Sequence, residues 1–315
     1  MQSLPPFRLA PFFSKRIWGF EDLNPWFHVK SEGDPIGEAW LTGDQCIVES
    51  GPLAGMALRD VAAQYGAQLL GSANDDRGFP LLIKVLFPKE KLSVQVHPDD
   101  AMAQKYGDPR GKTECWYALD AKPGSAVALG LKADADTVEI RSAIQQNRLE
   151  DYLNWVPVQA GDMIFVDAGT VHAIGPGLVI LETQQNSDLT YRMYDYGRPR
   201  ELHLDRSLEA MRMSTRAGKV QTRAEDDYTL LIDAQYFRVE RYAIGGSSAS
   251  QRFSAEAQSP SMQILFVANG KATIEGDGFD ALELDLCQVA VIPANAKDWR
   301  LNAAEPLELM RILPR

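Results

Sequence analysis

Cysteine and long apolar runs are scarce in this sequence of 315 residues. Its three cysteines, Cys46, Cys115 and Cys287, are odd in number and widely spaced, so we expect neither a disulfide framework nor paired thiolate ligands for a metal. Reduced thiols are typical of a cytoplasmic protein. No apolar run approaches the ~20 residues that span a bilayer, and the proline-broken N-terminus lacks the apolar stretch of a signal peptide. We therefore expect no association with a membrane.

Positively charged residues are also fewer than negatively charged ones. The chain has 32 lysines and arginines and 43 aspartates and glutamates, which gives a net charge of −11. This balance argues against a protein that grips nucleic acid or an anionic membrane surface. It leaves room for a small anionic substrate, since a site can be locally basic. Hydrophobic residues make up 45% and charged residues 24% of the chain, as in ordinary globular proteins, and the length allows about two domains.

Helical patterns are confined to short segments of the chain. Apolar residues at helical spacing and capping residues predict helices at about 56–70, 99–106, 134–153 and 204–213. Elsewhere short apolar or alternating runs are separated by glycine turns, most regularly after Val158. That spacing predicts a mainly β protein with a barrel or jelly roll.

The stretch Leu92–Asp100 alternates like a β-strand. Ser93, Gln95 and His97 share one face of that strand, and the opposite face is apolar. Pro98 then ends the strand, because it has no N–H to donate. A hydroxyl, an amide and an imidazole suit a site better than a core, although a lone histidine is more often a core residue with satisfied hydrogen bonds.

Similar polar exceptions occur on other predicted strands. Lys84 interrupts the apolar run 81–87, where a lysine usually lies at an edge or extends to solvent, and a ligand role is the alternative. Lys112 and Glu114 share a strand face, and His172 follows a glycine turn. Gln95, His97, Glu114 and His172 together offer the N and O ligands that a divalent metal needs.

The spacing around His172 resembles the second motif of the cupin jelly roll, in which glycine, proline, glycine and histidine recur at fixed intervals. Gly161, Gly169 and His172 match, and Asp167 stands in place of the proline. More specifically, four blocks resemble type I phosphomannose isomerases, in order along the chain. These blocks are LSVQVHPDD (92–100), GKTECWY (111–117), DAGTVHAIG (167–175) and QQNSDLTYRMYDYGR (184–198).

The resemblance implies a cupin fold and a zinc enzyme that interconverts mannose 6-phosphate and fructose 6-phosphate. It implies one Zn²⁺ per chain, a small sugar phosphate as substrate, and a monomer or homodimer. The resemblance also implies a role for each matching residue. Gln95, His97, Glu114 and His172 are expected as metal ligands, Arg192 and Lys112 as catalytic residues, and Ser93 and Lys84 as substrate-binding residues near the phosphate.

The chemistry of such a reaction suits these residue types. Moving a proton between C1 and C2 of a sugar passes through a cis-enediolate, whose negative oxygen needs a positive partner. Arg192 could supply that charge or clamp the phosphate, and a salt bridge to Asp188 or Asp195 is its structural alternative. We expect burial and a nearby cation to lower the pKa of Lys112 into the range of a proton carrier.

We expect a boundary near the charged segment Arg216–Asp227, which divides a metal-binding catalytic domain (1–225) from a C-terminal β module (226–315). Residues 290–298 resemble a decayed cupin motif with Asp298 where His172 stands, and no histidine follows His203. We therefore expect a degenerate cupin-like module without metal.

Two other functions remain open on the residues alone. His97, Glu114 and His172 form a two-histidine, one-carboxylate set that can bind Fe(II) in cupin oxygenases. A non-catalytic cupin that binds a sugar phosphate is the second alternative. An oxygenase function would leave the presence of Gln95, Lys112 and Arg192 unexplained. A protein that only binds a sugar phosphate would not need a complete set of metal ligands with Lys112 beside it.

Overall fold

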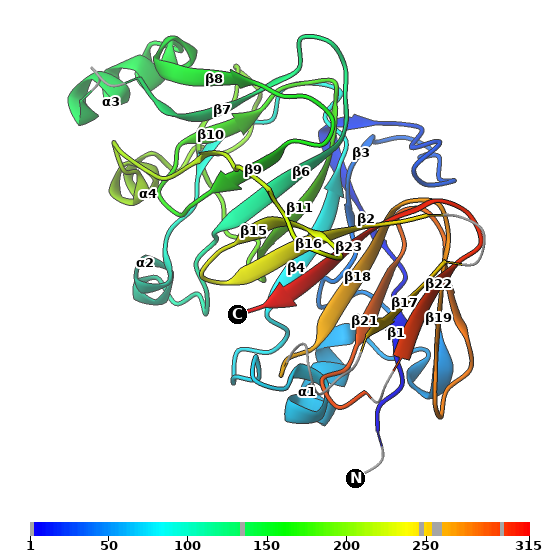
Figure 1. Ribbon diagram of the computed structural model, residues 1–315. Helices are drawn as coiled ribbons and strands as arrows, with labels where there is room; N and C mark the ends of the chain where they lie inside the picture. The colour runs from blue at the N-terminus through cyan, green and yellow to red at the C-terminus, as the bar shows by residue number, and fades with distance from the viewer. Residues whose placement is uncertain (1–2, 133–135, 246–248, 254–259, 297–298) are drawn as a thin grey trace.

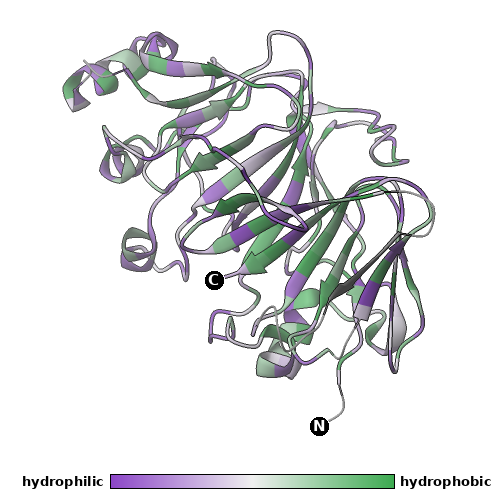
Figure 2. Ribbon diagram, in the orientation of Figure 1, coloured by the Kyte–Doolittle hydropathy of each residue, from purple (hydrophilic) through white to green (hydrophobic). Residues whose placement is uncertain are grey.

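The computed structural model describes residues 3–132, 136–245, 249–253, 260–296 and 299–315. The backbone is mainly β, as predicted, and Figure 1 shows two β modules that lie side by side. Figure 2 shows apolar residues gathered along the strands of both modules. Among the described residues, no helix is long and apolar enough to cross a membrane.

The N-terminal module contains two antiparallel sheets. The first has the strand order β12 (Tyr191–Tyr194), β5 (Val94–Val96), β10 (His172–Ile174), β7 (Ala126–Leu131) and β8 (Leu153–Pro157). The second has the order β13 (Gly218–Lys219), β9 (Met163–Val166), β6 (Glu114–Ala121), β11 (Leu178–Gln185), β4 (Leu81–Leu86), β3 (Ile36–Trp40) and β2 (Phe12–Phe20). Buried Val127 and Ile174 of the first sheet share a core with Trp116 and Ile180 of the second, so the two sheets enclose a jelly-roll interior.

The C-terminal module repeats this arrangement. One sheet has the order β1 (Phe7–Arg8), β21 (Val289–Ile292), β18 (Gln263–Asn269), β23 (Leu307–Pro314), β16 (Phe237–Ile244), β15 (Thr229–Asp233) and β14 (Arg223–Ala224). The other has the order β17 (Ala249–Phe253), β22 (Trp299–Ala303), β19 (Ala272–Gly276) and β20 (Leu282–Leu284). Leu265, Ile274, Leu301 and Leu309 pack between them. Asp298, the proposed counterpart of His172, lies outside the described residues.

The helices are short and lie outside the sheets (Figure 1). They are α1 (Leu58–Leu70), α2 (Asp100–Lys105), α3 (Thr137–Gln145) and α4 (Leu204–Ala210), with 3₁₀ turns at Gly51–Leu53 and Leu149–Tyr152. The helix predicted at 134–153 is too long. A capping box between Asp136 and Glu139 starts α3. Asn147 has a φ of 56°, which ends the helical path, and Leu153 already belongs to β8.

The two modules share strands and core. Phe7 of β1 pairs with Val291 of β21, and β14 pairs with β15, so residues from before 226 complete the C-terminal sheet. One buried cluster includes Leu81 and Cys115 of the first module and Phe266 of the second. The division into 1–225 and 226–315 stays a prediction, and the range 226–315 does not hold all of its own sheet, because β1 and β14 come from the first range.

Candidate metal centre and active site

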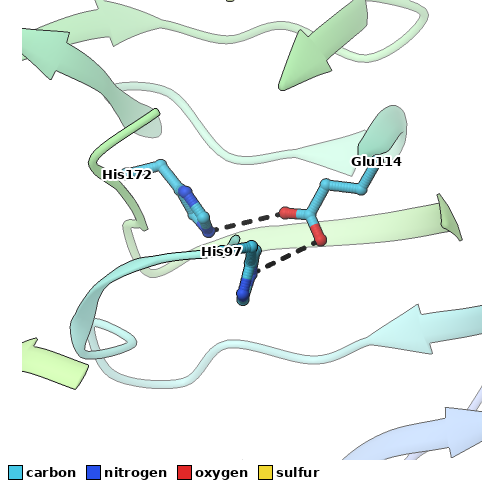
Figure 3. A group of neighbouring side chains, drawn as sticks. All are labelled: His97, Glu114 and His172. Atoms are coloured by element: carbon cyan, nitrogen blue, oxygen red, sulfur yellow. Dashed lines mark ion pairs between the residues drawn. The ribbon is translucent and has the colours of Figure 1, made fainter. Parts of the chain in front are cut away.

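Three buried side chains converge in the interior of the N-terminal module. His97 follows β5, Glu114 begins β6 and His172 begins β10, and their ligand atoms all lie within 4.8 Å of one another. Nε2 of His97 is 3.7 Å from Oε2 of Glu114, and Nε2 of His172 is 3.5 Å from Oε1 (Figure 3). The structure therefore brings together the two histidines and the carboxylate that the sequence singled out.

Hydrogen bonds aim both imidazoles at the carboxylate. Nδ1 of His97 is 2.8 Å from the carbonyl oxygen of Leu189, and Nδ1 of His172 is 2.9 Å from that of Thr170. Each Nδ1 therefore carries the proton and each Nε2 presents a lone pair, the arrangement of metal-bound histidine. Burial holds the histidine pKa values low, that of His172 at about 4 and that of His97 well below its usual range, with a further contribution from Lys112.

Nε2 of His97, Nε2 of His172 and Oε1 of Glu114 have no hydrogen-bond partner among the described residues. Oε2 of Glu114 has Nζ of Lys112 beside it, at 3.2 Å. Unpaired buried polar atoms are costly, and native proteins rarely keep them without a role. Two neutral imidazoles and a carboxylate are ligands that Zn²⁺ and related divalent ions accept. The residues present therefore fit a divalent metal.

Gln95 lies in a row of facing residues across the first sheet. It is the register partner of His172 on one side and of Arg192 on the other. Register partners on adjacent antiparallel strands project to the same face. Gln95 therefore points to the side of the sheet that carries His172, and its role as fourth ligand stays a prediction.

All the predicted site residues outside the buried triad line one cavity of about 470 Å³: Lys84, Ser93, Gln95, Lys112 and Arg192. The triad lies directly behind this wall, because Nζ of Lys112 is 3.2 Å from Oε2 of Glu114. A volume of this size suits a small metabolite.

The expected low pKa of Lys112 is wrong for the protein as described. Burial alone would lower the pKa of this amine, but the charges of Glu114, Glu182 and Asp188 raise it above its usual value. The sequence pattern showed only the first of these carboxylates. Lys112 is thus a protonated donor at the cavity wall.

Lys84 neither lies at an edge nor extends to solvent, since β4 is central in its sheet and the side chain is 3% exposed. Its Nζ lies 3.8, 3.6 and 3.5 Å from carboxylate oxygens of Glu38, Glu182 and Asp188. It also lies 4.6 Å from the ring centre of Trp40. Arg16, whose Nε lies 3.0 Å from Glu38, and Lys112 also line this part of the cavity, so positive and negative side chains are mixed there.

Sequence reasoning missed Glu182. This buried carboxylate lines the cavity, and it accepts a hydrogen bond of 3.2 Å from Nε1 of Trp116. Burial and the neighbouring charge of Glu114 raise its pKa. The signal was available, because Glu182 is a charged residue in the apolar run Leu178–Leu181, the same kind of exception as Lys84.

Arg192 is free of the salt bridge that was its structural alternative. Within the described chain, Asp195 pairs with Arg198 and Arg200, and Asp188 pairs with Lys84. Nη1 of Arg192 donates to the carbonyl oxygen of Glu201 at 2.8 Å, and its Nε is buried without an acceptor in the described part of the chain. The guanidinium is therefore fixed in place with its charge uncompensated.

Comparisons with known proteins identify relatives of the whole chain. A sequence model of the phosphomannose isomerase type I catalytic domain matches residues 7–131. The mannose-6-phosphate isomerase of Streptococcus mutans is 32% identical over 94% of this chain and 95% of its own length. ManA of Bacillus subtilis, a mannose-6-phosphate isomerase, is 35% identical over 87% of this chain and 86% of its own.

This chain belongs to the type I phosphomannose isomerases. The crystal structure of the Bacillus subtilis mannose 6-phosphate isomerase has a TM-score of 0.87 and 29% identity to it, and the match covers 98% of this chain and 99% of the other. A putative mannosephosphate isomerase from Archaeoglobus fulgidus, at 19% identity and a TM-score of 0.80 over the full length of both chains, shows the fold alone. The matches extend through the C-terminal module, so both modules belong to the architecture of the family.

Proposed function

We propose that this protein is a metal-dependent isomerase that interconverts mannose 6-phosphate and fructose 6-phosphate through a cis-enediolate. The observation that carries the proposal is the buried set of His97, Glu114 and His172 behind a cavity lined by Lys112 and Arg192. Membership of the phosphomannose isomerases supports the choice of substrate.

We propose that His97, Glu114, His172 and Gln95 hold one Zn²⁺ per chain. When bound, the metal would act as a Lewis acid toward the carbonyl and hydroxyl oxygens of the sugar. The convergence of the three buried ligand groups and the position of Gln95 in the row with His172 support this ligand set.

The residues of the chain itself can move and hold the proton. Glu182 is the base that the geometry favours, because it lines the cavity and because burial and the charge of Glu114 raise its pKa above the usual value of a carboxyl group. Lys112 keeps a proton at Nζ and donates a hydrogen bond to a substrate oxygen. Arg192 offers a fixed positive charge to the oxygen that becomes negative in the enediolate.

Ser93 and Lys84 are proposed as substrate-binding residues. Both are buried, and both line the cavity. The carboxylates around Lys84 are acceptors for sugar hydroxyl groups, and Lys84 and Ser93 can donate in return. This pattern of mixed donors and acceptors suits a hexose phosphate, with Lys84 and Ser93 near its phosphate.

The two alternative functions are not favoured. A cupin oxygenase would use the triad alone, and a binding protein would not need the triad. The two relatives named above are mannose-6-phosphate isomerases, and this chain matches most of the length of each. We further propose a cytoplasmic enzyme, because its substrate is a charged intermediate of carbohydrate metabolism, acting as a monomer or homodimer.

A coupled assay of mannose 6-phosphate conversion to fructose 6-phosphate tests this function. We expect turnover by the purified protein, loss of turnover on chelation, and recovery when Zn²⁺ is added back. Conversion that consumes oxygen with bound iron would instead support the oxygenase. Metal-loaded, folded protein that fails to convert the substrate would refute the proposal.

A further inference from the structure

Lys112 and Glu114 are held in place by different means. Glu114 is the first residue of β6, and it pairs with Val166 of β9 on one side and with Gln184 of β11 on the other. Lys112 precedes the strand, and the described ladders of β6 do not include it. The position of this lysine at the cavity wall therefore depends on contacts outside the sheet.

The residue before Lys112 lies directly against the start of α2. The amide nitrogen of Gly111 donates a hydrogen bond of 2.8 Å to Oδ1 of Asp100. The amide nitrogen of Lys112 donates one of 3.0 Å to the carbonyl oxygen of Pro98. A Cβ on Gly111 would lie 2.4 to 2.6 Å from backbone atoms of residues 98–100, so the close approach of the two segments requires glycine.

Gln185, at the end of β11, holds the residue on the other side of Lys112. Gln185 is 2% exposed. Its Nε2 donates to Oδ1 of Asp100 at 2.8 Å, and its Oε1 accepts a hydrogen bond of 2.9 Å from the amide nitrogen of Thr113. Both ends of the side-chain amide are thus engaged, as buried polar groups require. Asp100 and Gln185, which we call the clamp, together bind the backbone on both sides of Lys112.

The carboxylate of Asp100 is also held at its second oxygen. Oδ2 accepts a hydrogen bond of 3.4 Å from the hydroxyl group of Tyr236, in the turn between β15 and β16 of the C-terminal module. Oδ2 also lies 3.7 Å from Nη1 of Arg77. Contacts at both oxygens limit rotation of the carboxylate. Asp100 does not itself line the substrate cavity, so it can act on the reaction only through the residues that it holds.

We propose that Asp100 and Gln185 are positioning residues that set the place of Lys112 at the cavity wall. This inference rests on the proposed function, in which Lys112 donates a hydrogen bond to a substrate oxygen. A displacement of about 1 Å in a group that acts on the substrate can cost roughly 10²-fold in rate. Because Glu114 keeps its strand partners when the clamp is lost, kcat should fall while zinc binding persists.

The test compares Asp100→Ala with two matched variants, Asp100→Asn and Asp99→Ala. Asparagine keeps an oxygen that can accept from Gly111 and from Gln185, and its amide can donate to the hydroxyl group of Tyr236. Asp99 is the N-cap of α2, and its carboxylate accepts from the amide nitrogen of Met102 at 2.9 Å. Asp99→Ala therefore weakens the same end of the helix but leaves the clamp intact.

We expect Asp100→Ala to lower kcat for mannose 6-phosphate by roughly 10- to 100-fold, with zinc affinity near the wild-type value in competition with a chelator. Asp100→Asn and Asp99→Ala should keep a kcat near that of the wild type. Gln185→Met is the second variant, because methionine fills similar volume but bonds neither Asp100 nor the amide of Thr113. It should lower kcat in the same direction as Asp100→Ala.

Amide hydrogen exchange tests the clamp independently of activity. A hydrogen bond to a charged group corresponds to roughly 10- to 100-fold in an equilibrium constant. Exchange of the Gly111 amide should therefore be faster by about that factor in Asp100→Ala. Exchange of the Thr113 amide should be faster in Gln185→Met.

Wild-type kcat in both Asp100→Ala and Gln185→Met would refute the positioning role, even if Tm falls. An equal loss of kcat in Asp99→Ala would refute it as well, because the effect would then belong to α2. Loss of zinc in parallel with kcat would show that Glu114 had moved, and would refute the assignment to Lys112. If the wild-type protein fails to convert mannose 6-phosphate while Asp100→Ala still exchanges faster at Gly111, the proposed function is refuted and the clamp is supported.

Discussion

Lys112 and Glu114 form a buried ion pair, with 3.2 Å between Nζ and Oε2 and side chains that are 5% and 1% exposed. The lysine lines the cavity, and the glutamate belongs to the metal-binding triad. Lys112 lies two residues before Glu114, the first residue of β6, so the ion pair links the positions of the two side chains. The pair therefore couples the geometry of the metal site to a proton donor at the substrate.

The variant Lys112→Met tests proton donation to the substrate separately from metal binding. Loss of a positioned proton donor lowers kcat by roughly 10²- to 10⁴-fold. Methionine fills similar volume and removes a cation that opposes metal binding, so we expect affinity for Zn²⁺ at least as high as in the wild type. Steady-state kinetics and competition with a chromogenic chelator measure the two effects. Wild-type kcat in this variant would remove Lys112 from the mechanism.

Removal of a histidine from the triad should abolish metal retention. His172→Ala takes away one ligand of the buried set, while His28→Ala changes an exposed histidine that contacts only Asn24 among the described residues. We expect His172→Ala to lose bound zinc on dialysis and His28→Ala to keep it, as measured by elemental analysis. Equal zinc content in both variants would show that the metal lies elsewhere.

Arg192→Ala distinguishes a role in catalysis from a role in phosphate binding. A fixed charge on the enediolate oxygen acts in the transition state, and its removal lowers kcat by roughly 10²- to 10³-fold. Progress curves at saturating mannose 6-phosphate measure this effect. An unchanged kcat with a higher KM would assign Arg192 to binding of the phosphate alone.

Much of this site could be read from the sequence. The polar strand face of Ser93, Gln95 and His97 was visible as an alternation. Glu114 and His172 stood out as polar residues on other predicted strands, and the resemblance to the family supplied Arg192. Pairing of β5 with β10 and β12 then brought Gln95 between His172 and Arg192. No spacing along the chain predicts such a row, because it depends on which strands become neighbours.

The sequence could not predict which carboxylates surround Lys84 and Lys112. The pKa of Lys112 rises because Glu182 and Asp188 come from other segments of the fold. The three carboxylates around Lys84 come from three separate stretches of the chain. The long helix predicted at 134–153 failed for a local reason, since the positive φ of Asn147 leaves no trace in hydrophobic periodicity.

Glu38 should make stability depend on pH in the acid range. Burial opposes ionisation, but Lys84 and Arg16 lower its pKa below the usual 4.5. Below that pH the unfolded chain takes up a proton that the folded protein resists, so the contribution is complete above about pH 4.5 and is lost as the pH falls. Urea unfolding should therefore show a wild-type advantage over Glu38→Gln that is constant from pH 7 to 5 and shrinks below about pH 4.5. A gap that widens in acid would contradict this assignment.

Gly71, at the end of α1, allows the first module to contact residues 260–262 of the second. Its φ is +60°, and a Cβ there would lie 2.0 Å from the carbonyl oxygen of Pro260. Backbone strain and overpacking together make Gly71→Ala destabilising by about 2–5 kcal/mol in urea unfolding. Gly78→Ala is the control, because Gly78 also has positive φ but open space around it, so we expect about 1–2 kcal/mol from strain alone. Equal losses of unfolding free energy in the two variants would show that the backbone at Pro260 moves aside at no energetic cost.

The pairing of Phe7 with Val291 has a consequence for the order in which the protein can form during synthesis. The two strands are separated by almost the whole chain, so β1 must wait for β21 to leave the ribosome. At translation rates of about 5–20 residues per second, this wait lasts roughly 15 to 55 s. Closing so long a loop is also a late step in folding, because such contacts carry a high entropic cost. A partly synthesised chain therefore exposes the apolar side chain of Phe7 throughout, which makes the nascent N-terminal segment a natural site for chaperone binding.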